Sequence, residues 1–435
     1  MQPKHLHMQA HLSDSPEIKS LRALFDCAVS KAYPTTNLAH YLLPPPDGRV
    51  VVVGAGKAAA AMAKAVEDGL STVADSLVLV PYGHKRSCRL INIVEASHPV
   101  PDKAGEKAAR QILDLAVSLG ADDLLVCLLS GGGSALLNLP CTGITLEEKR
   151  VLTRELLACG AGIHDINTVR KHLSDIKGGR LAAAAFPART VTLAISDVPG
   201  NDPATIASGP TVGDPTTRQD ALEILSKYGI KPPSSIAAKL TSTTAESPFP
   251  GDPKLTASEI TITATAAEAL EAAAAYAEEQ GRKTVNLGDR VEGLASVLAS
   301  EHAKTFERER LIHSAGKDFV LISGGEATVV LHGNGKGGPN QEYLLALAIA
   351  LDGTPDVFAI AADTDGIDGA SQAAGAFITP NTLTRAAAQG LDPHAHLARN
   401  DAGGFFEQLG DLIITGPTCT NVNDFRAIAY IPSVD

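Results

Sequence analysis

Five glycine-rich loops in this chain each follow a run of apolar residues and carry polar or charged side chains. Glycine lets backbone N–H groups approach an anion closely, and it adopts the positive φ angles that such loops often need. The lysines and carboxylates among the glycines suit phosphate groups and a metal ion, so the loops together predict a site for both. They are Gly54–Lys57, Ser130–Ser134, Ser323–Glu326, Gly335–Glu342 and Asp365–Gly369.

The first loop lies between a predicted buried strand, 50–53, and a predicted helix. Gly54 and Gly56 begin the spacing G-x-G-x-x-A of dinucleotide-binding proteins, so NAD binding is one interpretation. That fingerprint expects an acidic residue at the end of the second strand, whereas the strand predicted at 77–80 ends in Pro-Tyr-Gly. Lys57 favours the other interpretation, because a lysine at a helix N-terminus attracts an anion. We expect Gly54 and Gly56 to contact phosphate and Lys57 to be catalytic.

The second loop, Ser-Gly-Gly-Gly-Ser, follows the predicted strand 124–129. A strand, such a loop and then a helix place backbone N–H groups around an anion. The alternative is a tight turn whose glycines are needed for packing. We favour phosphate binding by this loop, and the residues expected to take part are Ser130, Gly131, Gly132, Gly133 and Ser134.

Basic side chains are concentrated in the segment 167–179. A charge run of this kind usually forms a solvated helix face. In this acidic chain, however, a helix over the segment would place Arg170, Ser174 and Lys177 on one face, where they could meet an anion. We therefore expect Arg170 to be catalytic and, together with Lys177 and Lys57, to bind the substrate.

Two groups of carboxylates could hold a metal ion. Asp197 follows the predicted strand 191–195, and α/β folds bind ligands beyond the carboxyl ends of their strands. Hard oxygen ligands suit Mg²⁺, so Asp197 is the first expected ligand and also a catalytic residue. Asp365 lies between Asp363 and Asp368, at a spacing that resembles a calcium-binding loop, but Asp368 stands where that loop requires glycine. Asp365 is the second Mg²⁺ ligand that we expect.

The composition is that of a globular protein with more than one domain. The chain has 435 residues and a mass of 45.0 kDa, which exceeds one ordinary hydrophobic core. Its net charge of −12 disfavours binding to nucleic acid or to anionic membranes. No apolar run approaches the ~20 residues of a membrane span, and residues 1–15 do not read as a signal peptide. The separated cysteines indicate reduced thiols in the cytoplasm. A homodimer is compatible with these features, which leave the oligomeric state open.

Predicted strands and helices alternate along the chain, which indicates βαβ units, a parallel sheet and an α/β fold. A stretch rich in Pro, Ser and Thr, 231–258, is the predicted boundary between two α/β domains, 17–240 and 255–435. Further predicted elements are a helix at 17–32 and strands at 260–264, 319–323, 357–361 and 412–414.

Ordered motifs span nearly the whole chain. They are GAGKAA from Gly54, HPVPD from His98, LLSGGGSALL from Leu128, NTVRKHLSDIKGG from Asn167, SDVPGNDPATIASGPTVGDPT from Ser196, LISGGE from Leu321, GKGGPNQE from Gly335, ADTDGIDG from Ala362 and TGPTCTNVND from Thr415. Together they resemble the class II glycerate kinases, which are the glycerate 2-kinases of the MOFRL-domain family.

This resemblance implies a Rossmann-like N-terminal domain and a C-terminal MOFRL-type α/β domain, with ATP, Mg²⁺ and D-glycerate meeting in the cleft between them. It implies transfer of the γ-phosphoryl group to the 2-hydroxyl of D-glycerate, giving 2-phosphoglycerate and ADP. Lys57 then matches the family's active-site lysine. Further residues expected to contact the nucleotide or its phosphates are Gly324, Glu326, Lys336, Asn340, Thr418 and Asn421.

Pro339 departs from the family pattern, in which an arginine implicated in catalysis often follows the paired glycines. The positive charge of that arginine is expected to be supplied here by Arg170, Lys177, Lys336 or Lys57. Some relatives with this feature are named hydroxypyruvate reductases, so NAD(P)H-dependent reduction of hydroxypyruvate is the alternative function. A nucleotide-binding regulator without catalytic activity is a third.

Overall fold

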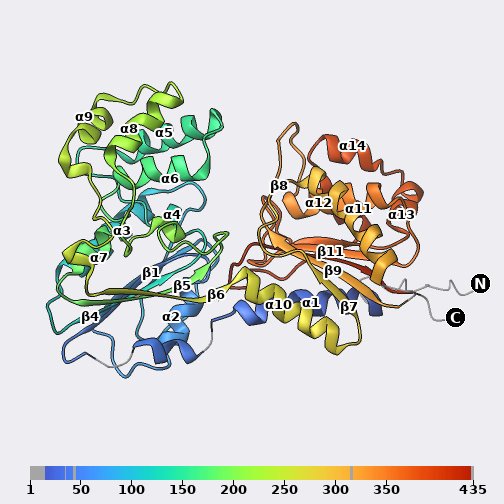
Figure 1. Ribbon diagram of the computed structural model, residues 1–435, viewed down its shortest axis with the longest axis horizontal. Coiled ribbons are helices and arrows are strands. Elements are labelled where there is room, and N and C mark those ends of the chain that lie inside the picture. The colour runs from blue at the N-terminus through green and yellow to red at the C-terminus, as the bar shows by residue number, and fades with distance from the viewer. Residues whose placement is uncertain (1–14, 35, 43–45, 314–316, 433–435) are drawn as a thin grey trace, which may run out of the picture. The chain divides into compact units, whose positions relative to one another are not determined.

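The chain forms two compact units, each discontinuous in sequence (Figure 1). The computed structural model describes residues 15–34, 36–42, 46–313 and 317–432. The expectation that no signal peptide is present falls almost entirely on residues outside this part. Among the described residues, the first unit, here called the parallel unit, contains those within 33–265 and 419–421, and the second, here called the mixed unit, contains those within 15–32, 266–418 and 422–432.

The two units differ in two segments from the predicted domains, 17–240 and 255–435. Helix α1 (Pro16–Ala32) packs against α10 (Ala266–Glu279) and so belongs to the mixed unit. Strand β6 (Ser258–Thr265) pairs in parallel with β5 and belongs to the parallel unit. The stretch 231–258 therefore lies within the parallel unit, because the strand that follows it completes that unit's sheet.

The parallel unit is built on a six-stranded sheet in the order β3-β2-β1-β4-β5-β6, and every neighbouring pair is parallel. The central strands are buried on both faces, as expected for a sheet that helices cover on both sides. The order reverses between β1 and β4, where open α/β sheets bind their ligands. The remaining strands are β1 (Val50–Ala55), β2 (Asp75–Pro81), β3 (Ile93–Ala96), β4 (Leu124–Leu129) and β5 (Arg189–Ser196).

Helices cover both faces of this sheet: α2 lies on one face, and α3, α4 and α7 lie on the other (Figure 1). The α3 face buries Ile112 together with strand residues such as Val53 and Leu129. Asp102 caps α3 by accepting a 2.9 Å hydrogen bond from the backbone N–H of Gly105. The elements are η2 (Thr36–Leu42), α2 (Ala59–Glu67), α3 (Lys103–Val117), α4 (Gly133–Leu136), α7 (Arg180–Ala185), η3 (Ile206–Ser208) and η5 (Pro253–Leu255).

A separate group of helices in the parallel unit has its own small core (Figure 1). Leu152, Val169, Leu225 and Ile236 meet there, one from each helix. Capping boxes fix the starts of two of these helices, at Thr145 for α5 and at Thr217 for α8. The members of the group are α5 (Leu146–Ala158), α6 (Ile163–His172), α8 (Arg218–Lys227) and α9 (Ser234–Thr241), followed by η4 (Thr243–Ala245).

The mixed unit contains a second six-stranded sheet, in the order β13-β12-β11-β14-β9-β7. Only the β7–β9 pair is parallel; the other pairs are antiparallel. The predicted parallel sheet is that of the parallel unit, whereas the sheet of the mixed unit is largely antiparallel. The strands are β7 (Lys283–Asn286), β9 (Phe319–Gly325), β11 (Val357–Asp363), β12 (Gly375–Ile378), β13 (Leu412–Ile413) and β14 (Asp424–Tyr430); β8 (Gly293–Leu294) and β10 (Ala327–Thr328) form a short separate pair.

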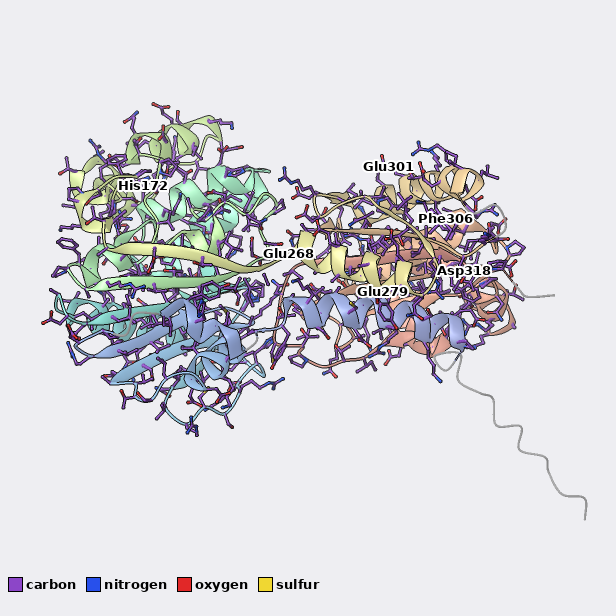
Figure 2. The ribbon with its side chains drawn as sticks, turned by 60° about the horizontal axis from the view of Figure 1, so that its bottom comes forward. His172, Glu268, Glu279, Glu301, Phe306 and Asp318 are labelled. Carbon is purple, nitrogen blue, oxygen red and sulfur yellow. The ribbon has the colours of Figure 1, made fainter. Side chains whose placement is uncertain are left out.

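Helices α1 and α10 lie on one face of this second sheet, and α11 and α12 lie on the other (Figure 1). Phe25 of α1 packs edge-on against Phe425 of β14, with ring centroids 6.0 Å apart. Phe306, labelled in Figure 2, packs against Phe319 on the opposite face. The helices not yet bounded are α11 (Ala295–His313), α12 (Pro339–Leu351), α13 (Thr382–Ala388), α14 (Pro393–Ala398) and α15 (Ala402–Leu409). None of the helices within the described residues is both long enough and apolar enough to span a membrane.

Candidate functional site

Three loops that the sequence singles out meet at one edge of the parallel sheet. Lys57 follows β1, Ser130–Ser134 follows β4, and Asp197 follows β5. These strands are neighbours and run in parallel, so their carboxyl ends lie side by side. The β1 and β4 loops flank the point at which the strand order reverses. This is the usual ligand position in such sheets.

Direct hydrogen bonds join the first two loops. The backbone N–H of Lys57 donates to the carbonyl of Gly131 at 2.8 Å, and that of Ala58 donates to Ser130 Oγ at 3.0 Å. Gly56 has φ +141°, and a Cβ on it would lie 2.1 Å from Ser130 Oγ. Glycine is therefore required at this position by the contact between the loops, whether or not a phosphate also binds. The side chain of Lys57 is partly buried beside them.

Asp197 and Asn421 close over the Ser-Gly-Gly-Gly-Ser loop. Asn421 Nδ2 donates to Asp197 Oδ2 at 3.1 Å, although the two residues are far apart in the sequence. A Cβ on Gly131 would lie 1.9 Å from Asn421 Nδ2 and 2.3 Å from Asp197 Oδ2. Only glycine leaves room for this contact. The structure thus brings together Lys57, Gly131, Asp197 and Asn421, four of the residues predicted from the sequence.

His98, the first residue of the motif HPVPD, is a neighbour of this site that is not among the predicted site residues. A Cβ on Gly132 would lie 3.1 Å from His98 Nε2 and 3.5 Å from Lys57 Cγ, so the imidazole and the lysine border the same glycine. His98 comes shortly after β3, at the same edge of the sheet. That position after a parallel strand is the signal by which the sequence could have placed it here.

Arg170 and Lys177 converge on the far end of the same loop. Lys177 Nζ donates to the carbonyl oxygen of Ser134 at 2.5 Å and contacts Ser134 Oγ at 3.1 Å. A terminal nitrogen of Arg170 donates to the same carbonyl at 3.2 Å. The expectation that Arg170, Ser174 and Lys177 share one helix face is nevertheless wrong, since α6 ends at His172. The turn after the helix, not helical spacing, brings the two cations together.

The rest of this basic segment is buried rather than solvated. Lys171 is 6% exposed and forms an ion pair with Asp214 at 2.7 Å. His172, labelled in Figure 2, is fully buried, and its Nδ1 lies 2.9 Å from the carbonyl of Ala245. Burial lowers the pKa of His172. The interpretation of this charge run as a solvated helix face is therefore wrong.

Positive charge accumulates around Arg170, and neither Arg170 nor Lys177 forms an ion pair with a carboxylate among the described residues. Lys177 is completely buried, and burial next to Arg170 and Lys149 moves the pKa of its ammonium group well below the usual value. Burial lowers the pKa of Arg170 as well. Lys149, which no motif contains, is 3% exposed, and burial beside Arg170 lowers its pKa to about 7. This local excess of positive charge favours binding of an anion.

The mixed unit carries the other residues expected to bind nucleotide, and these play different structural parts. Gly324 lies in β9, where a Cβ would lie 2.9 Å from the side chain of Leu270. Glu326 and Lys336 are exposed. Lys336 pairs with Glu407 at 3.5 Å on the surface, an ion pair that contributes at most about 1 kcal/mol.

Asn340 belongs to a buried polar network at the start of α12. Its side-chain amide donates to Asp424 at 2.6 Å and to Asp368 at 3.3 Å. Asp368 also accepts the backbone N–H of Gln341 at 2.9 Å, and burial near Asp424 raises the pKa of Asp368 to about 7. Pro339 occupies the first turn of this helix, where the missing N–H has no consequence and the fixed φ assists initiation.

Asp365 and Thr418 contact each other through the backbone. The N–H of Thr418 donates to the carbonyl of Asp365 at 3.0 Å, and its hydroxyl donates to the carbonyl of Thr364 at 2.5 Å. Asp365 itself accepts the N–H of Ile367 at 2.7 Å and is 2% exposed. Across the described residues, no three or more His, Cys, Asp or Glu side chains gather as a metal-binding group.

Comparison with known families matches two separate parts of the chain. Residues 20–241 match a family described as a domain of unknown function, DUF4147. Residues 319–424 match the MOFRL family.

Individual relatives cover almost the whole chain. A D-glycerate 2-kinase of Thermotoga maritima is 40% identical over 413 residues, 93% of this chain and 94% of the relative. A protein of Agrobacterium vitis named as a hydroxypyruvate reductase is 49% identical over 413 residues, 94% of this chain and 93% of the relative. The crystal structure of a glycerate kinase from Thermotoga maritima superposes with a TM-score of 0.83 at 37% identity, covering 95% of this chain and 99% of that one.

Proposed function

The chain belongs to the glycerate kinase family that combines the DUF4147 and MOFRL domains, and we propose that it transfers a phosphoryl group to the 2-hydroxyl of D-glycerate. The products are then 2-phosphoglycerate and the nucleoside diphosphate. The observation that carries the proposal is the meeting of Lys57, the loop 130–134 and Asp197 at the reversal point of the parallel sheet. Phosphoryl transfer depends mainly on positioning and on neutralising charge, which such an edge provides.

We assign the phosphates of ATP to the edge that contains Lys57 and the Ser-Gly-Gly-Gly-Ser loop. The Lys57 ammonium group supplies a point charge there, and a kinase needs positive charge where negative charge develops on the transferring group. Arg170 and Lys177, at the opposite end of the same loop, are suited to the carboxylate of glycerate.

Asp197 is the residue of this edge that suits Mg²⁺. The ion binds proteins through one or two carboxylates and takes its remaining ligands from water and substrate phosphates. One partly buried carboxylate beside the Ser-Gly-Gly-Gly-Ser loop fits that pattern, and no larger cluster of acidic residues is required. When bound, the ion would offset the negative charge of the phosphates.

A paired assay tests the proposed reaction. We expect release of ADP from ATP when D-glycerate and Mg²⁺ are present, with 2-phosphoglycerate identified by NMR. The same preparation should leave NADH unchanged when given hydroxypyruvate, the reaction suggested by the name of the Agrobacterium vitis relative. The end of β2 supports this expectation, because Pro81-Tyr82-Gly83 stands where an NAD-binding fold requires a carboxylate. NADH consumption without ADP release would contradict the kinase assignment.

Arg170→Lys is expected to reduce kcat/KM for D-glycerate about 10- to 100-fold while the protein remains folded. A guanidinium group binds a carboxylate through two parallel hydrogen bonds, whereas an ammonium group does not reproduce that geometry. Loss of one charged hydrogen bond costs about 1.5–3 kcal/mol. Steady-state kinetics measure the effect, with Arg154→Lys, an exposed arginine of α5, as the control. Equal kinetics for both variants would remove Arg170 from the substrate site.

A further inference from the structure

Lys149 is the feature of the parallel unit that the motifs leave unexplained. It lies on α5, in the sequence Leu-Glu-Glu-Lys-Arg, and such a charged stretch usually forms an exposed face. Instead the residue is 3% exposed, and its Nζ is buried without a hydrogen-bond acceptor among the described residues. A buried ammonium group without an acceptor is unfavourable. An anion bound nearby would offset that cost through its charge.

The surroundings of Lys149 are strongly positive. Arg170 of α6 and Arg180 of α7 both disfavour its charge, while Cys141 and Asp175 favour it. The carboxylate of Asp175 lies 3.9 Å from Arg110, so it is shared with another cation. Within the described part of the chain, Lys149 forms no ion pair.

Arg170 and Lys177 complete a cluster with Lys149. The charged groups of both residues reach the carbonyl of Ser134, and the buried Lys177 feels the charges of Arg170 and Lys149. Neither residue forms an ion pair with a carboxylate among the described residues. By contrast, the nearby buried Lys171 has its own carboxylate, Asp214, at 2.7 Å. The fold therefore provides a carboxylate for the buried Lys171. Among the described residues it provides none for the cluster of Lys149, Arg170 and Lys177.

We propose that Lys149 is the third cation of an oxyanion site formed with Arg170 and Lys177 at Ser134, and that this site receives the carboxylate of the substrate or a phosphate of the nucleotide. This inference rests on the proposed kinase function for the identity of the ligand. Arg170, the partly exposed member, meets the anion directly. Lys149 is a positioning residue, which stabilises the anion through its charge next to the guanidinium group.

Proton uptake is a consequence that distinguishes this role from a structural one. The pKa of Lys149 is lowered to about 7 in the free protein, so the ammonium group is partly deprotonated at pH 7–8. An oxyanion next to it raises that pKa again, so binding draws a proton from the buffer. The affinity should then fall as the pH rises above about 7, since the charged form of the cluster becomes scarcer.

Calorimetric titration of the full-length protein with D-glycerate, and separately with ADP, tests the inference. Performed in two buffers of different ionisation enthalpy, it reports both affinity and proton uptake. We expect Lys149→Met to weaken one of the two ligands about tenfold and to reduce the uptake. Lys149→Arg should retain the affinity but also reduce the uptake, because arginine stays protonated. The ligand whose affinity falls identifies the source of the oxyanion.

The control variant is Lys171→Met, which removes a buried lysine that has a partner. It should lower the unfolding temperature by leaving Asp214 unpaired, whereas Lys149→Met should raise it. Unchanged affinity for both ligands and unchanged proton uptake in Lys149→Met would overturn the inference, whatever happens to stability. If the wild type phosphorylates glycerate in that case, the proposed function stands without the site. If Lys149→Met weakens binding of D-glycerate or ADP but the wild type shows no turnover, the result would support the site and contradict the kinase assignment.

Discussion

Lys57→Ala is expected to lower kcat by about 10²- to 10³-fold, the usual cost of removing one charge contact that stabilises a transition state. The side chain is partly buried just after β1, and the backbone N–H of Lys57 holds the loop to Gly131. Alanine preserves that backbone contact, so the fold should survive. Steady-state kinetics with ATP and D-glycerate measure the loss, and circular dichroism and thermal unfolding confirm that the variant is folded.

Lys64→Ala is the matched control for this experiment. Lys64 lies on α2, directly after the same loop, and its ammonium group contacts Asp68 on the surface. The exposed pair with Asp68 contributes at most about 1 kcal/mol. The buried Glu67, 3.4 Å from Lys64 Nζ, keeps its hydrogen bond from the backbone N–H of Leu90, so activity should stay near that of the wild type. A folded Lys57→Ala enzyme as active as the Lys64→Ala enzyme would exclude a catalytic role for Lys57.

Asp197→Asn is expected to reduce turnover by about two orders of magnitude and to raise the Mg²⁺ concentration needed for half-maximal activity. Asparagine keeps the size of the side chain and can still accept the hydrogen bond from Asn421 Nδ2, so the loop packing should persist. What is lost is the negative charge that a divalent cation requires. A Mg²⁺ titration of the initial rate separates the effect on metal binding from the effect on kcat.

The control for the charge change is Asp114→Asn, which neutralises an exposed aspartate on α3. Its Mg²⁺ titration should match that of the wild type. A titration of Asp197→Asn that coincides with this control would show that Asp197 does not bind the metal. Reduced turnover at saturating Mg²⁺ together with an unchanged midpoint would restrict its role to positioning the loop through Asn421.

The sheet edge with Lys57 and Asp197 could be predicted because its signals are local. An apolar run followed by a glycine-rich or acidic loop indicates a buried strand and the position of its end. The strand predicted at 124–129 has the same bounds in the structure. Side chains that follow directly after such strands are then placed correctly by the parallel arrangement alone.

Other features depend on contacts between distant residues, which local patterns do not contain. Strand β14 is central in the mixed sheet, yet its sequence begins with Asp424 and contains Arg426, so it does not read as a buried strand. Arg426 is 1% exposed because it pairs with Asp424 and donates to the carbonyl of Gly324 at 3.2 Å. The burial of Lys149 escapes prediction because lysine is usually exposed, although its spacing places it on the same face of α5 as the buried Leu146 and Leu152.

The discontinuity of the mixed unit determines the order in which the chain can become stable during synthesis. Helix α1 leaves the ribosome before the other described elements, but its apolar residues, such as Leu21 and Phe25, pack against segments that follow 265. The centre of the sheet beside it, β14, is made after the other described strands. At ~5–20 residues per second, about 20–80 s pass between the synthesis of α1 and that of β14. During that time the apolar face of α1 is exposed on the nascent chain. Folding in the cell should therefore depend on chaperones that bind α1.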